Sequence, residues 1–345
     1  MTSLSGYINT QKNNHSLSKD NDQFFYGHGK LLLSGEYFVL DGAQSLALPT
    51  KVGQSLSVKY SPSFSPKLYW KSFDVDGNLW LEASFEFWQF DIVGEEKCES
   101  KLFLQKILRE ARKQNPHFLR DDVDVHVETR LGFPLKWGLG SSSTLVHNIA
   151  QWAYISPFEL YFNTYGGSGY DVACAQSDGP ILYCKNSMGP NWSPIFFGPE
   201  FSDKLYFIYL GKKQNSRDGI SYYNSQKPHS AELITNLTRI TEDMVKSKSL
   251  EEFEFLVKAH ENLVGENLNM VPVKQKLFSD FWGEVKSLGA WGGDFALVTS
   301  SRGSEETEEY FKEKGFDTFI PFNELILENR QRVANQFEES NDILH

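Results

Sequence analysis

Residues 138–143 form a glycine- and serine-rich segment with the chemistry of a phosphate site. They have the sequence Gly-Leu-Gly-Ser-Ser-Ser, and apolar residues with helical spacing follow at positions 145, 146, 149, 150 and 153. A glycine-rich turn that opens a helix presents unpaired N–H groups at the positive end of the helix dipole, where phosphate oxygens bind. The serine hydroxyls are suited to helix capping, to phosphate binding or to Mg²⁺ coordination. A capped helix after a flexible turn is the alternative, and neither a Walker A loop nor a nucleophile elbow is present.

A second segment places an acidic side chain among glycines. Residues 166–173 have the sequence Gly-Gly-Ser-Gly-Tyr-Asp-Val-Ala. Three glycines around one serine let a ligand approach the backbone closely. Asp171 then stands at the edge of a tight turn, where a carboxylate can hold a substrate hydroxyl or accept its proton. Taken alone, an aspartate after glycines is more often a turn or capping residue.

Two further segments stand out, one for a lysine in an apolar strand and the other for its glycines. Residues 27–37 bring Lys30 into an apolar strand and end in Gly35, Glu36 and Tyr37. A lysine entering such a strand either reaches an anion or extends along the surface from an edge. Residues 289–295 form a glycine-rich link from a helix to a strand, which by itself is typical of a helix C-terminus.

In this order, the four segments resemble the GHMP kinase superfamily of small-molecule kinases, across residues 26–300. The Gly-Leu-Gly-Ser-Ser-Ser run matches the ATP-phosphate loop of that family, and Gly35 to Tyr37 match its G-E-[HY] element. Ser-Gly-Tyr-Asp-Val-Ala and the late Gly-Gly-Asp are closer to phosphomevalonate kinases than to mevalonate or galactose kinases.

The resemblance implies roles for individual residues. Lys30 and Asp171 are implied as catalytic, Lys30 by stabilising charge on the transferring oxygens and Asp171 as the proposed base. ATP is implied to contact Lys136, Trp137, Gly138, Leu139, Gly140, Ser141, Ser142 and Ser143, and Mg²⁺ to contact Ser142 or Ser143. The small-molecule acceptor is implied to contact Glu36, Ser168, Gly169, Tyr170, Lys212, Ser216, Arg217, Gly292 and Gly293.

The chain also departs from the family pattern. His28 replaces the usual proline before Gly-Lys, and Trp291 replaces a glycine in the late loop. The stretch between residues 144 and 165 is short, and Glu159 is the one glutamate there where mevalonate kinases carry a Mg²⁺ ligand. The best prediction is phosphomevalonate or mevalonate as acceptor. A homoserine- or sugar-type kinase is the alternative within the enzymes, and a paralogue that binds nucleotide or metabolite without turnover is the alternative outside them.

Strands and helices in both halves of the chain predict an α+β fold. Alternation of apolar residues predicts strands at 55–60 and 122–129, and a hairpin is predicted around residues 76–78. Helices are predicted at 101–113, 230–246, 249–268, 273–288 and 305–314, and strands at 30–33, 205–210, 295–300 and 316–320. The resemblance implies two domains with the site between them: residues 23–195, like domain 2 of ribosomal protein S5, and residues 196–345, ferredoxin-like. Residues 1–22 are expected to be a disordered tail.

Composition limits the partners of the chain. Its 345 residues include 34 Lys plus Arg and 45 Asp plus Glu, for a formal net charge of −11, which argues against a nucleic-acid binder. No apolar run has the length of a membrane helix, and three cysteines without a CxxC pair favour the cytoplasm. We expect a monomer or homodimer. Two anions in one cleft require a local positive patch, predicted from Lys30, Lys136, Lys212, Lys213 and Arg217.

Overall fold

The computed structural model describes residues 22–94, 97–120, 123–211, 216–226, 228–289 and 294–328. The chain divides into two compact units, and each takes residues from several stretches of sequence. The first unit is built from Met1–Gly29, Val52–Leu135 and Leu139–Gln176, and the second from Lys30–Lys51, Lys136–Gly138 and Ser177–His345. Strands β1 (Gln23–Leu32) and β2 (Ser45–Pro62) pair with each other, and both contribute residues to each unit.

The sheet of the first unit is mixed. From its edge it runs through β5 (Asp91–Ile92), β4 (Leu79–Glu86), β3 (Lys67–Phe73), β6 (Val123–Leu131) and the second part of β2. The pairing of β3 with β6 is parallel, and the other pairings in this series are antiparallel. Along β6 every second residue from Val125 is buried, which is the period of a strand with one covered face.

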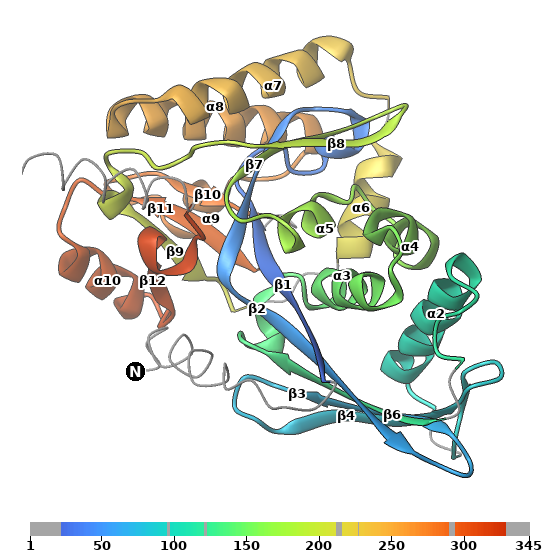
Figure 1. Ribbon diagram of the computed structural model, residues 1–345. Coiled ribbons are helices and arrows are strands. Elements are labelled where there is room, and N and C mark those ends of the chain that lie inside the picture. Colours follow the sequence, from blue (N-terminus) through green and yellow to red (C-terminus); the bar gives the residue numbers. More distant parts are fainter. Residues whose placement is uncertain are drawn as a thin grey trace, which may run out of the picture. The chain divides into compact units, whose positions relative to one another are not determined.

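Helices cover that face of the sheet. They are α2 (Glu99–Gln114), α3 (Ser141–Ala153), α4 (Pro157–Thr164) and α5 (Tyr170–Ala175), and they lie together in Figure 1. One apolar core joins them to the strands: Val125 and Val127 of β6, Leu104 and Ile107 of α2, and Ile149 of α3 all belong to it. Burial of this shared core is what fixes the position of α3, whose first turn carries the serine run.

The second unit has a four-stranded antiparallel sheet. Its order is β10 (Val285–Ser287), β11 (Phe295–Thr299), β9 (Leu205–Tyr209) and β12 (Phe319–Pro321). All five residues of β11 are buried, so both faces of this strand are covered. The first three residues of β2 pair with β7 (Ile181–Asn186), which forms a hairpin with β8 (Gly189–Pro194).

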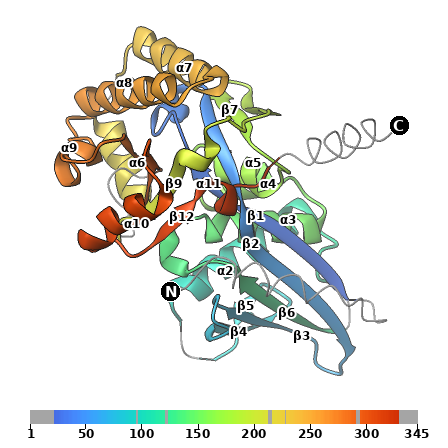
Figure 2. The ribbon, with the colours of Figure 1, turned by 90° about the vertical axis from the view of Figure 1, so that its left-hand side faces the viewer.

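Helices make up much of the rest of the second unit. They are α6 (Ser216–Ser225), α7 (Ala231–Lys246), α8 (Leu250–Leu268), α9 (Val273–Leu277), α10 (Ser304–Glu313) and α11 (Phe322–Leu325). The long helices α7 and α8 run side by side in both views (Figures 1 and 2). Short 3-10 turns η1 (Phe38–Asp41), η2 (Leu135–Trp137) and η3 (Ser202–Lys204) complete the described elements.

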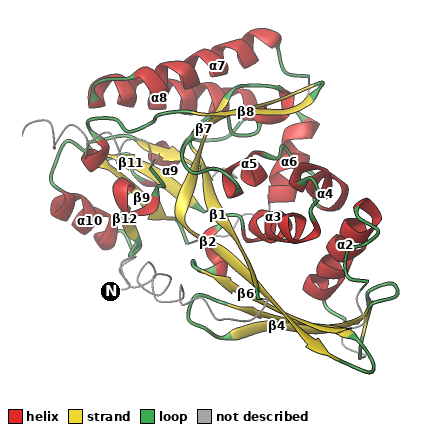
Figure 3. Cartoon of the chain, in the orientation of Figure 1, coloured by secondary structure: helices red, strands yellow, loops and turns green. Residues whose placement is uncertain are grey.

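The predicted α+β class is confirmed, because helices and strands alternate in both units (Figure 3). The predicted strands overlap β1, β2, β6, β9, β11 and β12, and the hairpin around Gly77 joins β3 to β4. The predicted helix at 273–288 is wrong beyond Leu277: α9 ends there, and residues 285–287 form β10. Strand pairing with β11 overrides the apolar spacing that suggested one continuous helix.

Two expectations are not decided by the described residues. Residues 1–21, which contain almost all of the predicted tail, lie outside them. No described helix is long and apolar enough to cross a membrane.

Candidate active site

The glycine loop has the backbone of an open helix N-terminus. Gly138 has φ +64° and Gly140, the N-cap of α3, has φ +91°, a region that side-chain-bearing residues seldom adopt. Ser141, Ser142 and Ser143 form the first turn of α3, where backbone N–H groups lack partners within the helix. Ser143 is buried and its hydroxyl donates to the Gly140 carbonyl at 2.8 Å, whereas Ser141 and Ser142 are partly exposed.

Buried polar contacts hold α3 against β2. The hydroxyl of Thr144 donates to Oε1 of Gln54 at 2.7 Å, and the side-chain amide of Asn148 donates to the Gln54 carbonyl at 2.9 Å. All three residues are almost completely buried. Gly27 lies so close that a Cβ there would be 3.3 Å from the Cα of Thr144. The first turn of α3 is therefore held rigidly relative to the sheet.

Asp171 lies in the first turn of α5, after Gly169 with φ +93°. Its Oδ2 accepts a hydrogen bond from the hydroxyl of Tyr161 at 2.9 Å. Burial first, and the Asp171 charge second, raise the pKa of Tyr161 well above its usual value, so the phenol keeps its proton and donates. Helices α3 and α5 are in contact, and Val172 belongs to the same core as Ile149. The first unit thus brings the serine run and the Ser168–Asp171 segment onto neighbouring helices (Figure 1).

In the second unit, Lys30 is half-buried in β1 and is followed by the buried Leu31, Leu32 and Leu33. Glu36 is completely buried, and its Oε1 accepts a hydrogen bond from Nζ of Lys286 in β10. Burial raises the pKa of Glu36 to about 7, and Lys286 opposes that rise. The predicted contact of Glu36 with an acceptor stays a prediction.

The start of the glycine loop is attached to the sheet of the second unit. The hydroxyl of Tyr209 donates to the Lys136 carbonyl at 3.0 Å, and Trp137 packs edge-to-face on Phe295 with ring centroids 5.4 Å apart. A Cβ at Gly138 would overlap the carboxylate of Asp294, so glycine is required there by space as well as by φ. Lys136 itself is exposed.

Several predicted residues are not placed. Lys212, Lys213, Trp291, Gly292 and Gly293 lie outside the described residues. Ser216 and Arg217 begin α6, but only their backbone is described. The positive patch therefore stays a prediction, as do the acceptor contacts of these residues.

Two residues at which the chain departs from the family pattern, His28 and Glu159, lie in the described part of the structure. His28 packs edge-to-face on Tyr26, with centroids 5.1 Å apart. Burial first, and the neighbouring His28 second, lower the pKa of His147 on α3 to about 4, so that imidazole is neutral.

Glu159 is exposed in the first turn of α4. Among the described residues, no three His, Cys, Asp or Glu side chains gather as a metal site, and the predicted Mg²⁺ contacts of Ser142 or Ser143 stay a prediction.

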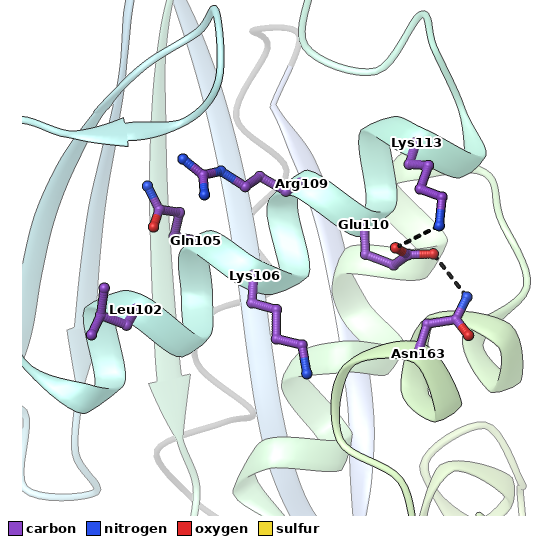
Figure 4. A pocket seen from close by; sticks show the side chains of 7 residues that line it. All are labelled: Leu102, Gln105, Lys106, Arg109, Glu110, Lys113 and Asn163. Atoms are coloured by element: carbon purple, nitrogen blue, oxygen red, sulfur yellow. Dashed lines mark hydrogen bonds and ion pairs between the residues drawn. The ribbon is translucent and has the colours of Figure 1, made fainter.

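A separate pocket lies on the outer side of α2 (Figure 4), with a cavity volume of about 260 Å³. Its cations are already engaged: Lys106 donates to the Thr164 carbonyl, Arg109 pairs with Asp91, and Lys113 pairs with Glu110. It contains none of the predicted site residues.

Solved structures of several small-molecule kinases resemble this chain in fold. The structure of L. major mevalonate kinase in complex with R-mevalonate matches 86% of this chain and 93% of its own, with a TM-score of 0.59 and 16% identity. Streptococcus pneumoniae phosphomevalonate kinase in complex with phosphomevalonate and AMPPNP matches 85% and 97%, with a TM-score of 0.61 and 16% identity. Lactococcus lactis galactokinase complexed with galactose matches 94% and 98%, with a TM-score of 0.58 and 12% identity. The chain has the GHMP kinase fold.

Comparison of the whole sequence with protein-family models and with curated proteins does not detect this likeness. No protein-family model matches the chain, and no curated protein matches it. In this GHMP kinase fold the glycine loop and the Asp171 turn open neighbouring helices, as described above.

Sequence reasoning missed Tyr161, Gln54 and Lys286, which contact site segments from distant positions. Helix α4, which carries Tyr161, was also missed, although its start has a recognisable signal. Ser156 caps it by accepting from the Glu159 N–H, and Pro157 follows at the first helical position.

Proposed function

We propose that the chain is an ATP-dependent small-molecule kinase that transfers the γ-phosphoryl group of ATP to a small anionic acceptor, phosphomevalonate or mevalonate. The observation that carries this proposal is the glycine loop. Two left-handed glycines open the N-terminus of α3, and Gln54 holds that helix in place. The fold is shared with a phosphomevalonate kinase whose structure was solved with phosphomevalonate and AMPPNP.

The loop suits a triphosphate. The N–H groups of Ser141, Ser142 and Ser143 lie at the positive end of α3 and would bind phosphate oxygens. When bound, Mg²⁺ would neutralise charge on the phosphates. The Ser143 hydroxyl is buried and donates to Gly140, so the partly exposed Ser142 is the better candidate for the metal.

In the proposed reaction, an acceptor oxygen forms a bond to the γ-phosphorus while the bond to the β–γ bridging oxygen breaks, and ADP leaves. Lys30 would stabilise the charge on the transferring oxygens. If the acceptor is an alcohol, Asp171 would take the hydroxyl proton. A phosphate acceptor needs no strong base, and Asp171, already accepting from Tyr161, would then mainly orient or hold Lys30.

The test is a panel of acceptors incubated with ATP and Mg²⁺, with ADP release and ATP binding measured in parallel. Phosphomevalonate offers a phosphate as the acceptor group, whereas mevalonate, homoserine and galactose offer a hydroxyl. ADP release that depends on one of the first two supports the proposal. Release with homoserine or a sugar supports the other kinase types, and tight ATP binding without release supports a non-catalytic paralogue.

A further inference from the structure

The backbone at Tyr37 is strained. This residue has φ +63° and ψ −48°, and the N–H of Phe38 donates to the Glu36 carbonyl at 2.8 Å. These features define a γ-turn with positive φ, a rare form for a residue with a bulky side chain. Such a conformation persists only where its surroundings fix it.

Contacts from three distant elements hold this turn. Nε2 of His260 in α8 accepts from the N–H of Gly35 at 2.9 Å. Nζ of Lys286 in β10 donates to Oε1 of Glu36. The ring of Tyr37 stacks on Tyr223 of α6, with centroids 5.8 Å apart and an interplanar angle of 15°.

The cation of this cluster is Lys286. Because Nε2 of His260 accepts a hydrogen bond, it carries no proton, and its 3.4 Å approach to Glu36 is not an ion pair. Lys286 is completely buried, and its ammonium also donates to the Ser287 carbonyl at 3.0 Å and approaches Oε1 of Glu261 at 3.5 Å. Removing one member of such a buried pair leaves a charge without compensation.

We propose that Lys286 and His260 are positioning residues, which hold the turn of Gly35, Glu36 and Tyr37 in its strained form and thereby shape the acceptor side of the site. The inference rests on the proposed kinase function. The turn follows Lys30 by five residues, and the three residues directly after Lys30 are all buried. A displaced turn would therefore disturb both the acceptor contacts and the strand that presents Lys30.

The test compares Lys286→Met with the double variant Lys286→Met/Glu36→Gln and with a control. The double variant leaves one buried carboxyl, Glu261, without Lys286, whereas the single variant leaves both Glu36 and Glu261 without it, so the double variant should be the less destabilised of the two. The control is Lys274→Met/Glu284→Gln, which removes a 2.9 Å ion pair of the same unit that does not touch the turn. Hydrogen exchange of the peptide spanning residues 33–38 reports on the turn without any need for turnover.

We expect exchange in this peptide to accelerate at least about tenfold in the double variant and in His260→Leu, with exchange elsewhere and in the control unchanged. We expect acceptor KM to rise or kcat to fall at least about tenfold in His260→Leu, which keeps Glu36, with ATP affinity near that of the wild type. Wild-type exchange in both variants, together with wild-type kinetics in His260→Leu, would overturn the inference. If the wild type itself has no turnover, the kinase proposal fails, and the exchange rates still decide whether these residues hold the turn.

Discussion

The hydroxyl of Tyr161 donates to the carboxylate of Asp171 at 2.9 Å, from α4 to α5. The phenol is buried and its pKa is raised, so it acts as a donor across the physiological range. One oxygen of the carboxylate is thereby held in a fixed direction, while Oδ1 lies 3.2 Å from the N–H of Val172. Asp171 is a preorganised acceptor on a helix next to the one that carries the serine run.

Removing the Tyr161 hydroxyl tests this preorganisation. We expect Tyr161→Phe to lose about 1.5–3 kcal/mol of unfolding free energy, the range for a hydrogen bond to a charged group. We expect a reduction of kcat of several-fold, smaller than that of Asp171→Asn, because the carboxylate remains but is less well oriented. Urea unfolding and steady-state kinetics provide the two numbers. Equal unfolding free energies of the variant and the wild type would show that the hydrogen bond from Tyr161 to Asp171 does not stabilise the fold.

The glycine at position 138 is expected to be essential. Gly138→Ala places a methyl group both at φ +64° and against the Asp294 carboxylate. Gly77→Ala is the matched control, because Gly77 has φ +82° with no atom near the added Cβ. The control should cost only the left-handed penalty of about 1–2 kcal/mol. We expect Gly138→Ala to lower the free energy of unfolding by more than the control does and to weaken ATP binding. Urea unfolding and calorimetry measure the two effects. An equal loss of unfolding free energy in both variants would contradict the close approach of Asp294.

The serines of the loop should divide into two roles. Ser142→Ala is expected to raise the Mg²⁺ concentration needed for half-maximal activity, because its hydroxyl is partly exposed. Ser143→Ala is expected to lower stability by about 1 kcal/mol, because it removes the bond to the Gly140 carbonyl. A Mg²⁺ titration of activity and a thermal unfolding curve for each variant separate the effects. The opposite assignment would follow if Ser143→Ala alone altered the Mg²⁺ requirement.

The buried carboxyl of Glu36 gives a pH dependence with a definite sign. Its pKa is raised from 4.5 to about 7 by burial, so the folded protein binds this proton more tightly than the unfolded chain. Its stabilising contribution is therefore complete below pH 4.5 and is lost as the pH rises to about 7. We expect the stability of the wild type relative to Glu36→Gln to fall across this window by at most about 1.4 kcal/mol per pH unit.

Urea unfolding of wild type and Glu36→Gln across this pH range provides the measurement. The comparison cancels the titrations that the two proteins share, those of the other carboxyls and of His260, whose lowered pKa by itself makes stability rise with pH. A relative stability that rises with pH would mean that Lys286 keeps Glu36 ionised.

The chemistry-bearing segments could be predicted because each is local. The glycine loop, the Asp171 turn and the alternation of Val125 and Val127 are all short-range patterns, and each forms the element expected of it. The class of fold followed from these elements.

The contacts that support the site could not be predicted, because they join distant residues through tertiary packing. Lys286 meets Glu36 from 250 residues away, and β10 is a three-residue strand whose identity depends on pairing with β11. Neither the strain at Tyr37 nor the donor to Asp171 has a signal in the local sequence.

Phosphorus NMR of the reaction product tests the central claim most directly. Wild-type protein, ATP and Mg²⁺ are incubated with phosphomevalonate and, separately, with mevalonate. We predict a new diphosphate signal from the first or a new phosphate-ester signal from the second, reduced at least about tenfold in both Lys30→Ala and Asp171→Ala. Near-normal product formation by both variants, or no phosphorylated product from either acceptor with the wild type, would contradict the proposed function.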